Sequence, residues 1–131
     1  MDTRKRYLEK NLPLYRVKPP SDPEALKRVI QRSEVGLKFG GADNEWGRMD
    51  FRADLARVRC PVLILSGDRD PIAPPEFSET IAKCLPPGLA RLERFENCGH
   101  GVFGDAPERA FAVIREFILT QAYSAAVALG P

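Results

Sequence analysis

Asp70 and His100 are the residues of this chain whose types and positions are best suited to chemistry. His100 is the only histidine in the sequence, and each of the two residues stands close behind a glycine. A carboxylate that accepts a hydrogen bond from one imidazole nitrogen fixes the tautomer of the ring and stabilises its protonated form. The alternative interpretation is an incidental loop histidine and a solvated aspartate in a turn. Because both residues follow predicted strands, we favour a catalytic acid–histidine pair.

The elements around the pair predict that the two side chains meet. Residues 62–65 are four consecutive apolar residues bounded by a proline and a glycine, which predicts a strand buried on both faces. A second strand, with interleaved charges typical of a sheet edge, is expected over residues 90–95. Functional loops of an open parallel sheet lie beyond the carboxyl ends of its strands, so Asp70 and His100 are expected at one edge.

Two helices are expected to cover this sheet. The first begins at Pro74, and the second takes Asp105 as N-cap, Pro107 in its first turn and Glu108 as reciprocal capping partner. The expected apolar stripe of the first helix is Phe77, Ile81, Cys84 and Leu85. The expected buried face of the second is Ala110, Phe111, Val113, Ile114, Phe117 and Ile118. Strand, helix, strand and helix over residues 61–120 predict an α/β fold class built on a βαβα unit.

The composition excludes several classes of function. A net charge of +2 does not indicate nucleic-acid binding, and no segment is apolar enough for a signal peptide or a membrane span. The basic first twenty residues are interpreted as a solvated helix face rather than an arm for an acidic partner. Three cysteines without C-x-x-C spacing and one histidine predict no metal site and no cofactor. Cys60, Cys84 and Cys98 are expected to be small buried residues in a reducing compartment, the cytoplasm.

Four motifs of residues 50–120 carry a resemblance to a known family. They are Asp50-Phe51-Arg52 with Leu55, the run from Cys60 to Pro74, Cys98-Gly99-His100, and Asp105-Ala106-Pro107-Glu108. This region resembles the C-terminal portion of α/β-hydrolase-fold proteins of the broad AB-hydrolase type, which includes proline iminopeptidases, esterases and haloalkane dehalogenase relatives. The resemblance implies that Asp70 is the acid and His100 the base of a catalytic triad. Residues 1–49 are similar in general character to the end of a helical cap domain, and 121–131 are expected to form a flexible tail.

The serine of such a triad is not found in this sequence. The resemblance implies a Gly-x-Ser-x-Gly elbow and an oxyanion loop of His-Gly-Gly type, and neither pattern occurs. Ser66 and Cys98 are weaker alternatives for the nucleophile, and Asp68 is a weaker alternative for the acid or for a metal or phosphoryl site. The serines of the chain are Ser21, Ser33, Ser66, Ser78 and Ser124.

Two hypotheses of function follow from these patterns. The first is the C-terminal part of a serine-type hydrolase for a small ester or amide substrate, inactive alone and completed by a missing segment or a partner chain. The second is a non-catalytic remnant or interaction module that pairs through an exposed apolar sheet edge, including with a second copy of itself. We expect the isolated chain not to react with a fluorophosphonate probe of active serines.

Overall fold

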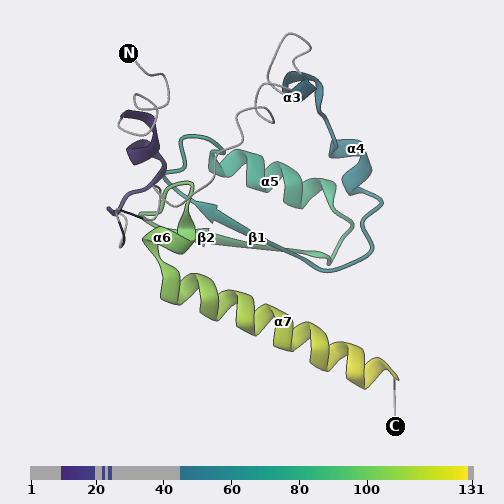
Figure 1. Ribbon diagram of the computed structural model, residues 1–131. Helices are drawn as coiled ribbons and strands as arrows, with labels where there is room; N and C mark the ends of the chain where they lie inside the picture. The colour runs from purple at the N-terminus through teal and green to yellow at the C-terminus, as the bar shows by residue number, and fades with distance from the viewer. Residues whose placement is uncertain (1–9, 20–21, 23, 25–44, 130–131) are drawn as a thin grey trace.

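The structure, a computed structural model, describes residues 10–19, 22, 24 and 45–129 (Figure 1). Most of the predicted helical segment 1–49 therefore lies outside the described residues. Among the described residues, the short elements that precede the sheet are a 3-10 helix and two single-turn helices: η2 (Leu12–Tyr15), α3 (Glu45–Arg48) and α4 (Arg52–Leu55).

Two parallel strands form the sheet of the described chain. β1 (Val62–Gly67) pairs with β2 (Ala90–Phe95), in a register that sets Val62 opposite Ala90 and Gly67 opposite Phe95. Both predicted strands are confirmed, and β1 continues two residues beyond the predicted apolar run. Because the strands run parallel and in register, the loops that follow them leave the sheet at the same edge.

One long helix covers each face of this strand pair: α5 (Pro75–Cys84) lies on one side and α7 (Pro107–Leu129) on the other (Figure 1). α5 begins at Pro75, one residue after the predicted start, with a proline in its first turn. Its predicted apolar stripe is wrong in part. Ser78 and Leu85 are buried, whereas Phe77 and Ile81 are exposed. The helix thus turns a small polar residue toward the sheet and leaves two large apolar ones uncovered by described residues.

The start of the last helix differs from the prediction. A short helix, α6 (Val102–Asp105), comes first, and Asp105 is its last residue rather than an N-cap of α7. In the predicted buried face Ala110 and Val113 are buried, but Phe111 and Ile118 are exposed. α7 continues to Leu129 and includes most of the segment expected as a flexible tail. That segment is rich in alanine, the best helix former, and has no glycine or proline before residue 130.

The hydrophobic core lies between the sheet and α7, directly beneath the loop edge. Its buried members are Phe95, Cys98, Val102, Ala110 and Val113, with Leu63 and Leu65 packed against them. Of the cysteines, expected to be buried, Cys98 lies in this core, Cys84 is half-buried and Cys60 is exposed. None of the described helices is both long and apolar enough to cross a membrane. The loops pack on this core, and this packing fixes the direction in which they leave the strands.

Candidate active site

Two loops at the carboxyl edge of the sheet are held together by hydrogen bonds that involve their backbone groups. We define the acid loop as residues 68–73, after β1, and the histidine loop as residues 97–101, after β2. The N–H of Asp68 donates to the carbonyl of Phe95 at 3.0 Å, and the N–H of Arg69 donates to the carbonyl of Cys98 at 2.9 Å. The carboxylate of Asp68 accepts from the N–H of Cys98 at 3.2 Å. Asp68, the weaker alternative for the acid, therefore holds the histidine loop and has no hydrogen bond to His100 within the described chain.

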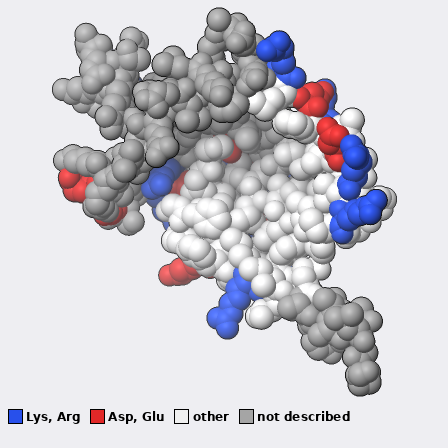
Figure 2. Space-filling model, turned by 45° about the vertical axis from the view of Figure 1, so that its right-hand side comes forward, with Lys and Arg blue, Asp and Glu red and all other residues white. Residues whose placement is uncertain are grey.

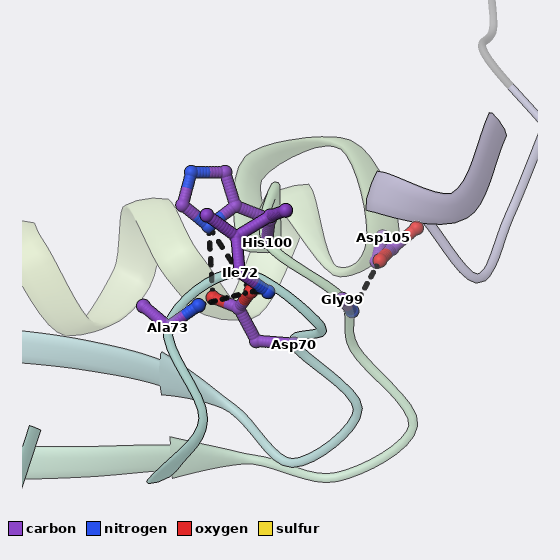
Figure 3. Close-up of polar contacts among 6 residues, drawn as sticks. All are labelled: Asp70, Ile72, Ala73, Gly99, His100 and Asp105. Atoms are coloured by element: carbon purple, nitrogen blue, oxygen red, sulfur yellow. Dashed lines mark hydrogen bonds and ion pairs between the residues drawn. The ribbon is translucent and has the colours of Figure 1, made fainter. Parts of the chain in front are cut away.

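Asp70 and His100 meet across these loops (Figure 3). The Nδ1 atom of His100 lies 2.9 Å from Oδ2 and 3.1 Å from Oδ1 of Asp70. The same carboxylate accepts from the backbone N–H groups of Ile72 at 2.8 Å and Ala73 at 2.9 Å. The predicted contact between Asp70 and a ring nitrogen of His100 is thus confirmed, and that nitrogen is Nδ1. The acid loop folds around Asp70, so that the carboxylate of Asp70 points at the imidazole ring of His100.

The two side chains differ in exposure, and hydrogen bonds keep the buried one ionised. The Asp70 side chain is 9% exposed and that of His100 is 45% exposed. Burial raises the pKa of Asp70, but the backbone N–H groups of Ala73 and Ile72, together with His100, outweigh it and hold the pKa below its ordinary value. Because an ionised carboxylate can only accept, Nδ1 is the donor. In the neutral ring Nε2, which points away from Asp70 in Figure 3, is then free to accept a proton.

Neither weaker candidate nucleophile is positioned for attack. Ser66 lies on β1, 4% exposed, and its Oγ has no hydrogen-bond partner among the described residues. Cys98 is 2% exposed, and its Sγ lies 3.5 Å from the carbonyl oxygen of Glu96. Burial, with the nearby charge of Asp105, raises the pKa of the Cys98 thiol, so the reactive thiolate is disfavoured. Ser66, Ser78 and the three cysteines, whose side chains the structure describes, have no hydrogen bond to His100.

Two glycines allow the loops to approach so closely. A Cβ atom on Gly67 would lie 2.2 Å from the carbonyl oxygen of Gly99, and one on Gly99 would lie 2.5 Å from the carbonyl oxygen of Tyr15. The sequence places these two glycines close before Asp70 and His100. Neither has a positive φ, so close backbone contact, rather than turn conformation, is what excludes a side chain there.

Two residues beside the site were missed by sequence reasoning. The carboxylate of Asp105 is fully buried and accepts from the N–H of Gly99 at 2.7 Å, next to His100 (Figure 3). The ring of Tyr15 meets the His100 ring edge-on, with 5.6 Å between ring centroids. The sequence interpretation treated Asp105 as a helix cap and so missed its contact with the histidine loop. Nothing in the sequence around Tyr15 indicates contact with a loop so far along the chain. Within the described residues, no cluster of three or more potential metal ligands occurs.

The comparison with protein families agrees with this architecture. The sequence model of the alpha/beta hydrolase family matches residues 4–113 of the chain. Because the match covers most of its length, the protein belongs to the alpha/beta hydrolase family. The match begins well before residue 50, where the motifs that suggested the family begin, so it extends into the segment that could be compared only in general character.

Curated relatives of this chain are hydrolases of greater length. The AB hydrolase superfamily protein YisY of Bacillus subtilis (strain 168) is 29% identical over 116 residues, which make up 88% of this chain and 40% of that protein. The pimeloyl-[acyl-carrier protein] methyl ester esterase of Aromatoleum aromaticum is 39% identical over 69 residues, or 53% of this chain and 27% of that enzyme. The chain thus spans less than half the length of these relatives.

Solved structures show the same partial coverage. The esterase EaEST from Exiguobacterium antarcticum superimposes with a TM-score of 0.62 at 24% identity, over 88% of this chain and 43% of that one. MGS-MChE2, an alpha/beta hydrolase enzyme from lagoon sediments of Mar Chica, gives 0.59 at 25% identity, over 76% of this chain and 44% of that one. The predicted fold class, part of an α/β-hydrolase sheet, is confirmed. The finer likeness to proline iminopeptidases stays a prediction.

Proposed function

We propose that this chain supplies the acid and the general base of an ester-hydrolysing site. The observation that carries the proposal is the 2.9 Å contact between Asp70 and the Nδ1 atom of His100, with Nε2 left free on a half-exposed ring. An imidazole held in this tautomer by a buried carboxylate is the arrangement that general-base activation of a hydroxyl nucleophile requires. The names of the relatives, esterases among them, support an ester as the bond cleaved.

The chemistry follows from that tautomer. His100 Nε2 takes the proton of a serine hydroxyl as the serine oxygen bonds to the ester carbonyl carbon. His100 then returns the proton to the departing alcohol as the carbon–oxygen bond breaks, and a second cycle with water releases the acid. Asp70 stays ionised throughout, because its hydrogen bonds favour the charged form, and it stabilises the imidazolium. The substrate class is a small-molecule ester, with a small amide as the alternative.

The nucleophile is proposed to come from outside the described residues, and the chain alone is proposed to be inactive. In support, Ser66 and Ser78 have no hydrogen bond to His100 among the described residues, and the relatives are more than twice as long as the segment they share with this chain. The three free cysteines support the prediction of a reducing, cytoplasmic setting.

The test uses a fluorophosphonate probe on two proteins. The chain alone is expected not to be labelled; stoichiometric labelling would reveal a nucleophile that lies within it. The second protein joins the chain to the part of YisY that precedes its matching region, which should restore labelling and hydrolysis of a p-nitrophenyl ester. His100→Ala in the chimera should abolish both, while Glu108→Gln, on an exposed carboxylate, serves as the matched control. Hydrolysis that survives His100→Ala would contradict the assignment.

A second candidate function, assembly through the sheet edge, is favoured by a different observation. β1 has a single strand neighbour among the described residues, and large apolar side chains on both helices, Phe77 and Phe111, are exposed. Figure 2 shows a broad face without Lys, Arg, Asp or Glu, bordered by charged side chains. An open strand edge beside apolar surface favours pairing, with a second copy or with another chain. Sedimentation velocity should show a concentration-dependent dimer; a strict monomer at high concentration would exclude self-pairing.

A further inference from the structure

Asp105 is the most completely enclosed charged side chain of the described structure, with an exposed fraction of 0%. Its Oδ2 accepts from the N–H of Gly99 at 2.7 Å, and its Oδ1 from the N–H of Lys18 at 2.9 Å. The N–H of Val17 lies 3.2 Å from Oδ1 and 3.1 Å from Oδ2. Burial raises the pKa of Asp105, but these backbone donors and the charge of Arg16 hold it below its ordinary value. The carboxylate is therefore ionised and compensated at neutral pH.

The donors on Asp105 come from two segments far apart in sequence. Gly99 belongs to the histidine loop, while Val17 and Lys18 follow η2 and lie 88 and 87 positions before Asp105. The carbonyl oxygen of Tyr15 sits so close to Gly99 that a Cβ there would meet it at 2.5 Å. The ring of Tyr15 stands at 81° to that of His100. One carboxylate thus joins the segment that carries Tyr15 to the loop that carries His100.

We propose that Asp105 is a positioning residue, which seats Tyr15 against the imidazole of His100 by binding both segments through their backbone N–H groups. His100 is then held from two sides. Asp70 fixes Nδ1, and Tyr15 limits rotation of the ring away from Asp70. Asp105 touches neither the ring nor any reacting atom, so it acts only through its neighbours. This inference rests on the proposed role of His100 as the base, but its structural content can be tested independently of hydrolysis.

The chain offers a variant that removes the donors without altering the buried carboxylate. Val17→Pro with Lys18→Pro deletes both N–H groups on the Tyr15 side. Arg16, which would precede the new proline, already has extended backbone angles of φ −131° and ψ 147°, as a residue before proline requires. The side chains of Val17 and Lys18 are exposed, and no residue of the hydrophobic core is changed. Val17→Ala with Lys18→Ala is the matched control, because it truncates the same side chains and keeps both donors.

A second variant acts on the carboxylate itself. Asp105→Asn keeps the size of the side chain but has only one acceptor oxygen. The amide nitrogen must then face a backbone N–H group of Gly99 or of the Val17–Lys18 segment, so one of the two connections is lost. Glu108 is an exposed carboxylate three residues away, and Glu108→Gln is the control for the change of charge.

Nuclear magnetic resonance of the full chain reads the outcome directly, because the single histidine gives one set of imidazole signals. Nuclear Overhauser contacts between the His100 and Tyr15 rings, and the exchange rate of the Nδ1 proton with water, are measured in each protein. The double proline variant and Asp105→Asn should lose the ring contacts. In both, exchange should be about tenfold faster, because a ring that Tyr15 no longer limits separates more often from the charged carboxylate of Asp70. The alanine pair and Glu108→Gln should match the wild-type chain.

Ring contacts and exchange that remain at control values in the double proline variant would overturn the proposal, even if Asp105→Asn fails to fold. A distinct result would overturn the proposed function. If Asp70→Asn leaves the Nδ1 proton unchanged, or the chimera with YisY folds and hydrolyses esters without His100, then His100 is not the base. The link from Asp105 to Tyr15 would still be decided by the proline variant.

Discussion

The loop edge of the sheet and the outer faces of its two helices differ in how completely their side chains are partnered. At the loop edge Asp68, Asp70 and Asp105 each accept at least one hydrogen bond from the backbone, and two glycines allow contacts that no other residue would permit. On the helices, Phe77 and Phe111 are about 60% exposed. The edge is therefore held locally by polar contacts between adjacent loops, whereas the helix faces present apolar surface that no described residue covers.

The largest effect is expected on activity, from a substitution at the loop edge that replaces Asp70. Asp70→Asn in the active chimera should lower kcat by roughly 10³–10⁴-fold, because the amide favours the wrong imidazole tautomer and does not stabilise the imidazolium. Steady-state hydrolysis of a p-nitrophenyl ester measures this. A fall of less than tenfold would mean that the loop edge is ordered for reasons other than catalysis.

A smaller effect, on stability, is expected from Gly67. Gly67→Ala places a methyl group 2.2 Å from a backbone oxygen and should lower the free energy of unfolding by about 3 kcal/mol. Gly88 is the matched control: it has φ +84° but open space around it, so Gly88→Ala should cost only about 1 kcal/mol. Urea unfolding followed by circular dichroism compares them. Equal losses would show that the loops can separate freely.

Acid should remove the stability that the carboxylates of Asp70 and Asp105 contribute at the loop edge. The folded-state pKa values of Asp70 and Asp105 lie below the ordinary value of 3.8. The unfolded chain therefore takes up protons first as the pH falls, so this contribution is full above about pH 4 and is lost as the pH drops toward the folded-state values. Urea titrations from pH 7 to pH 3 should show the decline, and Asp70→Asn should make it shallower. An unchanged slope would exclude Asp70 as a contributor.

The smallest effect is expected on the outer helix face. Phe77→Ser should change the free energy of unfolding by less than about 0.5 kcal/mol, since the side chain is already 59% exposed. It should nevertheless reduce any self-association seen by sedimentation velocity. Val113→Ala, on a buried residue, is the contrasting change and should cost about 2 kcal/mol. A large loss of stability from Phe77→Ser would show that this face is covered by residues outside the described part.

Prediction from sequence succeeded where the signal was local. The apolar run of β1, the prolines that open α5 and α7, and the glycines behind the two strands each follow from a few adjacent residues. It failed for the face of α5 because helical spacing identifies which residues share a face but not which face meets the sheet. It failed for Asp105 because an aspartate before a helix has the same local pattern whether it caps the helix or binds a distant segment.

The sequence by itself determined that an aspartate and the single histidine follow neighbouring parallel strands, since hydrophobic patterning and strand order are properties of the chain. Tertiary structure alone decided that Asp105 is buried beneath the histidine loop and that Tyr15 stands against the ring. These contacts join residues up to 88 positions apart and depend on angstrom-scale packing, which no local pattern encodes.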